Sequence, residues 1–293
     1  MMRNNITDYG LLLLLALIWS TSFLLIKVGV ETIPPFSLTA GRLCIAALIF
    51  WVYLGFRGEG IPLHRQALIL YFVVGIVGSS LPFVLISWGE TRISSSLTAI
   101  LMGIMPIATF VLAHIFISSE PMTRRKTLGV SLGFSGLLVL VGLSALGTLG
   151  DNLIGQLSVL GGAICYSFAT VFVRTQPAFE GYKMAAGMNT VAAIVSLVLA
   201  FTMENPTQLQ PDTNALGALL ILGIFPTAIA SLIYFRIIKN LGATTFSQIN
   251  YIIPVLGGTW GMLVLGESLG WNVFIALLLV LCGVYFIQSK SVG

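Results

Sequence analysis

Residues 93–106 read ISSSLTAILMGIMP and residues 241–254 read LGATTFSQINYIIP, and these two stretches decide the fold. When they are laid over each other at a shift of 148 residues, Pro106 falls on Pro254. In addition, Ile93 falls on Leu241, Ser96 on Thr244 and Ile104 on Ile252. Such a match across half of the chain indicates an internal repeat.

The correspondence extends beyond these stretches in both directions. Downstream, a single deletion brings Glu120 onto Glu267. Upstream, a shift of 147 residues brings Trp19 onto Tyr166. The chain is therefore predicted to be one unit written twice, as residues 1–150 and 151–293.

The composition predicts a membrane protein. Of the 293 residues, 57% are hydrophobic and only 8% are charged, whereas soluble domains carry about 25% charged residues. A helix needs about 20 apolar residues to cross a bilayer core of about 30 Å. The uncharged stretches long enough for this are Tyr9–Ile26, Gln66–Gly89, Ile93–Ser119, Thr127–Gly150, Asn152–Val173, Met184–Met203, Thr213–Phe235, Asn240–Gly266 and Ser268–Ser289. A tenth, Pro34–Phe56, is interrupted only by Arg42. We predict an all-α polytopic membrane protein with ten transmembrane helices.

The charges predict the orientation of these helices. Basic residues concentrate at the termini and in every second connection, at Arg3, Arg57, Arg65, Arg124, Arg125, Lys126, Arg174, Lys183, Arg236, Lys239 and Lys290. By the positive-inside rule both termini lie in the cytoplasm. Because each unit has five helices, an odd number, the second unit enters the membrane from the opposite face. Such inverted repeats are typical of carriers whose central site alternates between the two sides.

The two matched prolines, Pro106 and Pro254, fall near the middle of their predicted spans. A proline inside a helix removes one backbone hydrogen bond and clashes with the preceding turn. The freed carbonyl is then satisfied by a neighbouring helix or faces a cavity. We predict helix kinks at both positions with a role in gating; a kink without that role is the alternative.

Several polar and aromatic side chains are predicted at the depth of the lipid core. The amides of Gln248 and Asn250 are costly to place in hydrocarbon, so we expect them to face the interior. Trp19 and Tyr166 lie too deep for the interfacial aromatic belt and are candidates for contact with a substrate. Hydrogen bonding and packing between helices is the alternative for each of them. Arg42 lies about two turns into its helix, where it either extends outward to the interface or pairs inside the bundle.

Several functions are not supported by the sequence. No aspartate or glutamate lies in the middle of a span, so the usual carboxylate for proton or sodium coupling is missing. No GxxxxGK[ST], HExxH or GxSxG motif occurs, so we do not expect an enzyme. The three cysteines are too scattered for a metal site or a disulfide framework. We therefore expect no cofactor and no metal. We also expect no nucleic-acid partner, because the net charge of +4 comes mainly from the cytoplasmic loops.

With these features the chain resembles the drug/metabolite transporter superfamily, and within it the EamA-type family of ten-helix bacterial exporters. The resemblance covers essentially the whole chain. It rests on the doubled unit, on ALIWSTSFLLIK at residues 16–27, on the prolines of IMP and IIP, and on a glutamate followed 16 residues later by a glycine in each half. Within the family the chain is most similar to amino-acid exporters of the YddG type.

The resemblance implies a multi-pass transporter of the bacterial inner membrane with a central cavity. The substrate-cavity residues that it implies are Trp19, Ser22, Ser79, Ser80, Pro82, Phe83, Thr98, Met102, Tyr166, Gln248, Asn250 and Tyr251. YddG-type members carry more aromatic side chains near Ser79, Gly103 and Met105, so a broader cavity for several neutral amino acids is expected here.

Together these observations predict an exporter of amino acids, neutral or aromatic and of broad specificity, that works by uncoupled alternating access. Its predicted partners are the amino-acid substrate and the lipid bilayer, and a monomer is compatible with the sequence. A carrier of another small metabolite or drug is one alternative. A channel-like or structural membrane protein is the other.

Overall fold

The computed structural model describes residues 2–141, 149–177, 179–256 and 271–288, and every regular element in these ranges is helical. The first half contains α1 (Met2–Ser20), α2 (Ser22–Gly29), α3 (Pro35–Arg57), α4 (Arg65–Gly75), the π-helix η1 (Ile76–Ser80), α5 (Leu81–Glu90), α6 (Ser95–Met102), α7 (Ile104–Phe116) and α8 (Arg124–Val141). The second half contains α10 (Leu153–Thr175), α11 (Gly181–Met203), the 3-10 turn η2 (Pro206–Gln208), α12 (Thr213–Leu222), the π-helix η3 (Gly223–Ile229), α13 (Ala230–Leu241), α14 (Ala243–Ser247) and α16 (Trp271–Gln288).

Seven helical segments of the described residues are long and apolar enough to cross a membrane: Ile6–Gly29, Pro35–Arg57, Arg65–Glu90, Leu97–Phe116, Leu153–Thr175, Gly181–Met203 and Thr213–Leu241. A shorter apolar helix covers Phe274–Ile287. The predicted all-α polytopic membrane protein is thereby confirmed, while the count of ten helices and their inverted arrangement stay predictions. Glu267, the predicted counterpart of Glu120, lies outside the described residues.

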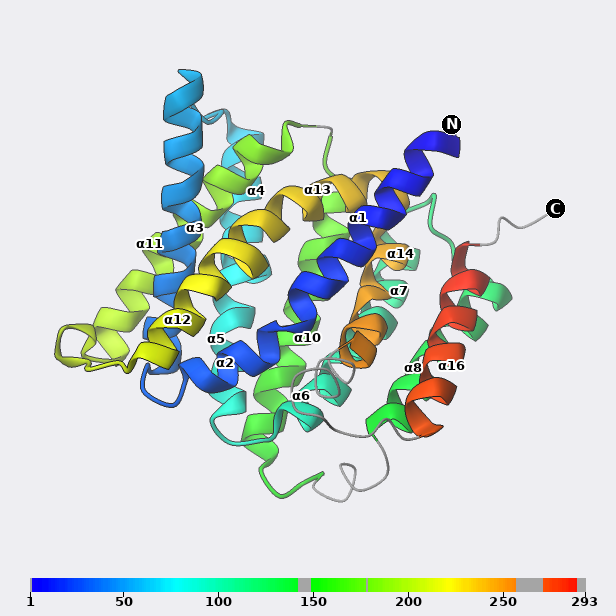
Figure 1. The fold of residues 1–293 in the computed structure, drawn as a ribbon. Coiled ribbons are helices and arrows are strands. Elements are labelled where there is room, and N and C mark those ends of the chain that lie inside the picture. Colours follow the sequence, from blue (N-terminus) through cyan, green and yellow to red (C-terminus); the bar gives the residue numbers. More distant parts are fainter. Residues whose placement is uncertain (1, 142–148, 178, 257–270, 289–293) are drawn as a thin grey trace.

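The helices form one bundle with α10 near its middle, as Figure 1 shows. α10 packs against α5 and α7, while α3 packs against α11 on one flank and α8 packs against α16 on the other. α1 packs along α13, and α2 along α12. α1 begins and α16 ends on the same side of the bundle, which we call the N-terminal side (Figure 1).

The outer surface of the bundle differs from that of a water-soluble protein, although the core is largely apolar in both. Large apolar residues face outward, for example Leu48, Val198 and Leu278, which are 64%, 58% and 65% exposed. Polar residues such as Thr39 and Asn189 are fully buried. An apolar exterior around a partly polar interior is what a lipid environment requires, because lipid offers no partner for polar groups.

Two of the spanning segments contain a turn of π-helix at matching places. α4 continues into η1 and then α5, and α12 continues into η3 and then α13. The two π-helices begin at Ile76 and Gly223. A π-turn widens a helix locally and is often found at functional sites.

Breaks divide other spans. The segment Leu97–Phe116 is interrupted at Gly103, three residues before Pro106, because a proline ring clashes with the carbonyl one turn earlier. The second half has a turn at Gln248 before the helical residues 249–256, which include Pro254. A gating role of the two prolines stays a prediction.

Candidate functional site: a central cavity

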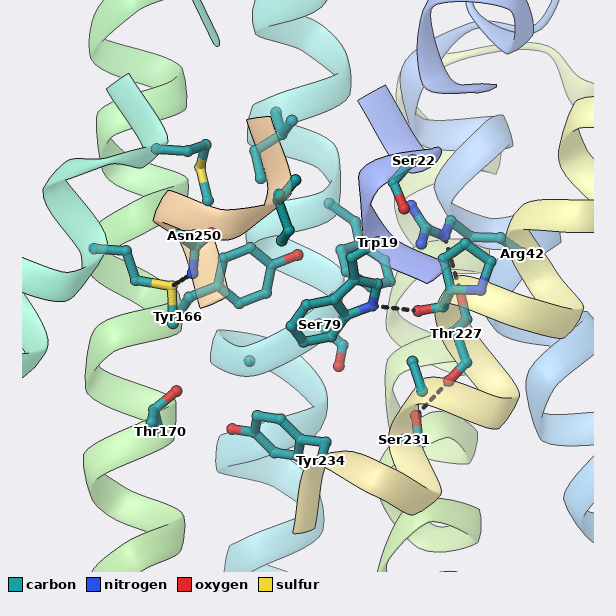
Figure 2. Close-up of a pocket in the computed structure, with 18 of the residues that line it drawn as sticks. Trp19, Ser22, Arg42, Ser79, Tyr166, Thr170, Thr227, Ser231, Tyr234 and Asn250 are labelled. Atoms are coloured by element: carbon teal, nitrogen blue, oxygen red, sulfur yellow. Dashed lines mark hydrogen bonds between the residues drawn. The ribbon is translucent and has the colours of Figure 1, made fainter. Parts of the chain in front are cut away.

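A cavity lies in the middle of the bundle, between the two π-helices and the elements around them (Figure 2). Its wall takes side chains from both halves of the chain. The lining residues are Trp19, Ser22, Phe23, Ile26, Arg42, Val74, Gly78, Ser79, Phe83, Ile86, Met102, Met105, Tyr166, Thr170, Met188, Pro226, Thr227, Ala230, Ser231, Tyr234, Phe246, Asn250 and Ile253. No aspartate or glutamate is among these described residues, and Arg42 is the one formal charge.

The residues that the sequence predicted for a cavity fall into two groups. Seven of them line this cavity: Trp19, Ser22, Ser79, Phe83, Met102, Tyr166 and Asn250. The other five, which are not among its lining residues, are Ser80, Pro82, Thr98, Gln248 and Tyr251. That the cavity binds a substrate stays a prediction for both groups.

Contacts between helices hold several members of the second group. The Ser80 hydroxyl lies 2.6 Å from that of Ser196 on α11. Tyr251 is fully buried and packs so closely on α8 that a Cβ at Gly133 would lie 2.3 Å from its ring. Gln248, by contrast, makes a local contact: it donates a long hydrogen bond of 3.4 Å to the carbonyl of Thr244, four residues earlier in the chain.

Aromatic rings form much of the cavity wall. Trp19 meets Phe246 edge to face, with ring centroids 6.0 Å apart, and Tyr234 meets the same ring at 5.2 Å. Phe83 and Tyr166 form another edge-to-face pair at 6.3 Å. Edge-to-face pairs stabilise one another by about 0.5–1.5 kcal/mol beyond the area that they bury. The wall is therefore a rigid, largely apolar surface from five elements.

Hydrogen bonds hold the polar side of the cavity around η3. The Trp19 Nε1–H donates to the carbonyl of Pro226 at 3.0 Å, which fixes the indole against the π-helix. The Thr227 hydroxyl donates to the carbonyl of Leu222 at 2.7 Å, and the Ser231 hydroxyl donates to the backbone carbonyl of Thr227 at 2.6 Å. These hydroxyls thus donate to backbone carbonyls four or five residues earlier in the chain, as serine and threonine side chains in helices often do.

The Ser22 hydroxyl on the cavity wall has no hydrogen-bond partner in the described part of the chain. The Asn250 amide donates to the Met105 sulfur at 2.9 Å and to the carbonyl of Ser247 at 3.3 Å. A small polar ligand would therefore find a free hydroxyl group, that of Ser22, beside an aromatic wall.

Arg42 lies inside the bundle and is only 3% exposed. Its Nε–H donates to the Thr227 hydroxyl at 3.0 Å, and its Cζ lies 3.9 Å from the centroid of the Phe83 ring. No carboxylate pairs with it among the described residues. An arginine at the centre of a spanning helix costs about 2.5–3.5 kcal/mol on insertion scales, and a cation–π contact returns about 0.5–2 kcal/mol. The contacts with Thr227 and Phe83 reduce this cost, but neither of them neutralises the positive charge of Arg42.

Sequence reasoning missed Thr227, Ser231 and Tyr234 as cavity residues, although the repeat contains the signal. The shift of 148 residues that pairs the two prolines also pairs Ser79 with Thr227 and Phe83 with Ser231. Applying the repeat to Ser79 and Phe83 would have found Thr227 and Ser231, but not Tyr234, whose repeat partner Ile86 was not among the predicted residues. Arg42 was recognised as unusual, but its direction could not be read from the sequence.

A polar cluster closes the N-terminal side of the bundle beside the cavity. Glu120, which follows α7, accepts hydrogen bonds from the backbone N–H groups of Ala243 and Thr244 at 2.9 Å each, and from the Thr244 hydroxyl at 2.8 Å. Arg174, at the end of α10, pairs with Glu120 at 3.2 Å and donates to the carbonyl of Ile238 at 3.3 Å. This cluster joins the ends of α7, α10 and α13 to the start of α14.

Nothing in the described residues resembles a metal site, because no group of three or more histidine, cysteine, aspartate or glutamate side chains gathers there. The chemistry that the arrangement offers is recognition by aromatic, hydroxyl and guanidinium groups.

Comparison with known proteins agrees with these features. The family model of the EamA-like transporter family matches residues 8–142 and 153–289. The uncharacterized transporter YoaV of Bacillus subtilis (strain 168) is 27% identical over 92% of this chain and 92% of its own length. The uncharacterized inner membrane transporter YedA of Escherichia coli (strain K12) is 27% identical over 99% of this chain and 95% of its own.

A further relative has a more specific name. The S-adenosylmethionine/S-adenosylhomocysteine transporter of Chlamydia trachomatis serovar L2 is 26% identical over 88% of this chain and 82% of its own length. One solved structure, described only as the crystal structure of a protein, superposes with a TM-score of 0.77 over 96% of this chain and 97% of that one. At 20% identity it shows that the fold is shared.

Proposed function

The chain belongs to the EamA-like transporter family, and we propose that it exports amino acids by alternating access through the central cavity. The protein is a multi-pass transporter of the bacterial inner membrane. The observation that carries the proposal is the composition of the cavity wall, which combines aromatic rings, hydroxyl groups and one guanidinium in its described part. A neutral amino acid presents the matching groups, namely an apolar or aromatic side chain beside a carboxylate and an ammonium.

We further propose that the fold consists of ten transmembrane helices in two inverted five-helix repeats, residues 1–150 and 151–293. The family model matches two ranges of similar length, one in each half. The positions that line the cavity support the same division, because many come in repeat-related pairs: Trp19 with Tyr166, Phe23 with Thr170, Gly78 with Pro226, Ser79 with Thr227, Phe83 with Ser231, Ile86 with Tyr234, Met102 with Asn250, and Met105 with Ile253. A site built from equivalent positions of two inverted units can be presented to either side of the membrane in turn.

The proposed transport is uncoupled, so the substrate gradient alone drives it. No carboxylate lines the cavity in the described residues, and a membrane-embedded carboxylate is the usual site of proton or sodium coupling. A pH gradient imposed on proteoliposomes should therefore not drive accumulation against the substrate gradient. Accumulation under that gradient alone would refute the uncoupled mechanism.

A second candidate substrate class is an amino acid with a large appended group. It is favoured by the relative that is named as an S-adenosylmethionine/S-adenosylhomocysteine transporter. Both of these molecules carry the same α-ammonium and carboxylate groups as a simple amino acid. The aromatic wall formed by Trp19, Tyr166 and Tyr234 would offer stacking surfaces to a nucleobase.

Counterflow in proteoliposomes tests the proposal. Vesicles are preloaded with one unlabelled compound at a time, and the entry of labelled threonine or phenylalanine is followed. A transient overshoot with amino-acid preloads is expected, and its size ranks the substrates. Overshoot only with S-adenosylhomocysteine would favour the second candidate, and overshoot only with an unrelated drug or metabolite would refute amino-acid transport. Flux without overshoot would indicate a channel.

Two substitutions connect this assay to the cavity. Trp19→Ala removes an aromatic wall residue, and Asn250→Ala removes an amide that faces the cavity, so both should reduce the counterflow rate. Thr202→Ala is the control, because Thr202 is exposed on the outer face of α11 and bonds only to carbonyls of its own helix. Equal rates in all three variants would mean that Trp19 and Asn250 serve packing only.

A further inference from the structure

Arg42 carries the only formal charge on the described wall of the cavity. It stands on α3, between the aromatic ring of Phe83 and the hydroxyl of Thr227. Figure 2 shows its guanidinium end beside Ser22 at one end of the cavity. A buried cation without a carboxylate partner calls for a counter-charge from elsewhere.

The contacts of Arg42 fix the orientation of its side chain. The Thr227 hydroxyl gives its own proton to the carbonyl of Leu222, so its oxygen is left to accept from the Arg42 Nε–H. The Phe83 ring covers one face of the guanidinium plane. The hydrogen bond to Thr227 uses Nε and the Phe83 ring covers the flat face, so neither contact occupies the two terminal nitrogens of Arg42.

The terminal nitrogens of Arg42 therefore remain available. A guanidinium has five N–H donors, of which Nε supplies one. The other four have no hydrogen-bond partner among the described residues. The nearby Ser22 hydroxyl, which also lacks a partner there, adds a further donor on the same wall.

We propose that Arg42 is the carboxylate subsite of the cavity: its terminal N–H groups bind the carboxylate of the transported molecule in a two-pronged contact. This inference deepens the proposed function and rests on it for the identity of the substrate. The planar fork of an arginine matches the two oxygens of a carboxylate, and it does so better than a lysine ammonium. The aromatic wall then receives the rest of the molecule.

The proposal defines a class of substrates. A ligand must carry an anionic group at one end and an apolar or aromatic body at the other, and the ammonium group is not required by Arg42. Amines and amides of the same shape leave the cation unpaired, so the cavity rejects them.

A series of analogues on the unmodified protein tests this without any mutation. Labelled phenylalanine counterflow is competed with 3-phenylpropionate, which lacks the ammonium group, and with phenylalaninamide and 2-phenylethylamine, which lack the carboxylate. The acid should compete, whereas the amide and the amine should compete about tenfold more weakly or worse, since a charge-assisted hydrogen bond is lost. Equal competition by phenylalaninamide and phenylalanine would overturn the proposal.

A binding measurement keeps the inference separate from the proposed function. The purified protein is heated with 3-phenylpropionate or with its uncharged amide, 3-phenylpropanamide, and the shift in melting temperature is recorded. The acid should stabilise the protein and the amide should not, even if no amino acid gives counterflow. Failure of counterflow together with this selectivity would refute amino-acid export and leave the carboxylate subsite standing.

Substitutions assign the selectivity to Arg42. R42Q should abolish the stabilisation by the acid, and R42K should retain part of it. The matched control is R92Q, because Arg92 is an exposed arginine that stacks on Trp88 outside the cavity. Selectivity that persists in R42Q, or that is lost equally in R92Q, would overturn the assignment.

Discussion

Glu120→Ala should destabilise the protein strongly although Glu120 lies outside the cavity. The carboxylate caps the start of α14 and pairs with Arg174, and its side chain is only 8% exposed. The substitution leaves two buried backbone N–H groups, those of Ala243 and Thr244, without an acceptor. Each such group costs about 1–3 kcal/mol. The ion pair adds less, up to about 1 kcal/mol, since the Arg174 side chain is 25% exposed. The expected loss is therefore about 3–5 kcal/mol.

Two further variants make this prediction quantitative. Glu120→Gln keeps one acceptor oxygen and the shape of the side chain, so its cost should be about 1–2 kcal/mol. Glu180→Ala is the matched control: Glu180 also forms an ion pair, with Lys183 at 2.7 Å, but its side chain is 57% exposed. An exposed pair contributes about 0–1 kcal/mol.

Thermal unfolding of the detergent-purified protein, followed by tryptophan fluorescence, measures all three variants. The melting temperature should fall most for Glu120→Ala, less for Glu120→Gln and hardly for Glu180→Ala. A Glu120→Ala protein that melts together with Glu180→Ala would refute the reasoning, because the capping bonds would then contribute nothing beyond a surface ion pair.

Three other predictions follow from the same structure. Gly242→Ala should lower the melting temperature, because Gly242 has a φ of +90° and a Cβ there would lie 2.7 Å from the Glu120 carboxylate. Gly217→Ala is the control and should leave the melting temperature unchanged, because a Cβ at Gly217 would have no atom within 4 Å. Tyr251→Phe should leave transport unchanged, since Tyr251 is buried and does not line the cavity. Tyr166→Ala should slow transport, because it removes one ring of the Phe83–Tyr166 pair from the cavity wall. A slower Tyr251→Phe protein would contradict this placement. Hydrogen bonds from Tyr182 and from Arg57 lower the pKa of Glu59 to about 2 in the folded protein. The contribution of ionised Glu59 to the stability of the fold is therefore complete above the pKa of about 4.3 that a glutamate has in the unfolded chain, and it is lost as the pH falls through about 2. The difference in melting temperature between Glu59→Gln and the parent should thus be constant from pH 5 to 8 and should shrink in acid; a difference that changes between pH 6 and 8 would exclude this origin.

The sequence predicted the all-helical membrane fold, and seven of the twelve residues that it predicted for the cavity line the cavity of the structure. Both predictions depend on features that repeat along the chain. Apolar runs define spans regardless of how the helices pack. Trp19 and Tyr166 were found since they occupy equivalent positions in two copies of one unit. The same logic, applied fully, reaches Thr227 and Ser231.

The failures concern the direction in which a side chain points. Thr98 and Gln248 are polar residues of the predicted depth, yet both are buried outside the cavity wall. Their spanning segments contain turns at Gly103 and at Gln248 itself, so no single helical periodicity runs through either segment to indicate which side chains face the cavity. A polar side chain at the depth of the lipid core can also serve either of two roles, ligand binding or hydrogen bonding between helices. Ser80 has the second role, because its hydroxyl bonds to that of Ser196 on the neighbouring helix.

Carboxylates at helix ends hold one pair of helices, α3 and α11, together at both ends, and hold a second group, α7, α10, α13 and α14, together at one end. Glu204, which follows α11, accepts hydrogen bonds from the backbone N–H and the hydroxyl of Ser37 at the start of α3. Glu59, which follows α3, pairs with Lys183 at the start of α11. The antiparallel pair α3–α11 is thus fastened at both ends. The cluster of Glu120 fastens α7, α10, α13 and α14 on the N-terminal side. Arg42 belongs to the α3–α11 pair, which is fastened at both ends. We therefore expect the carboxylate of the substrate to stay bound to this pair of helices, while the helices that meet at Glu120 separate to open the cavity.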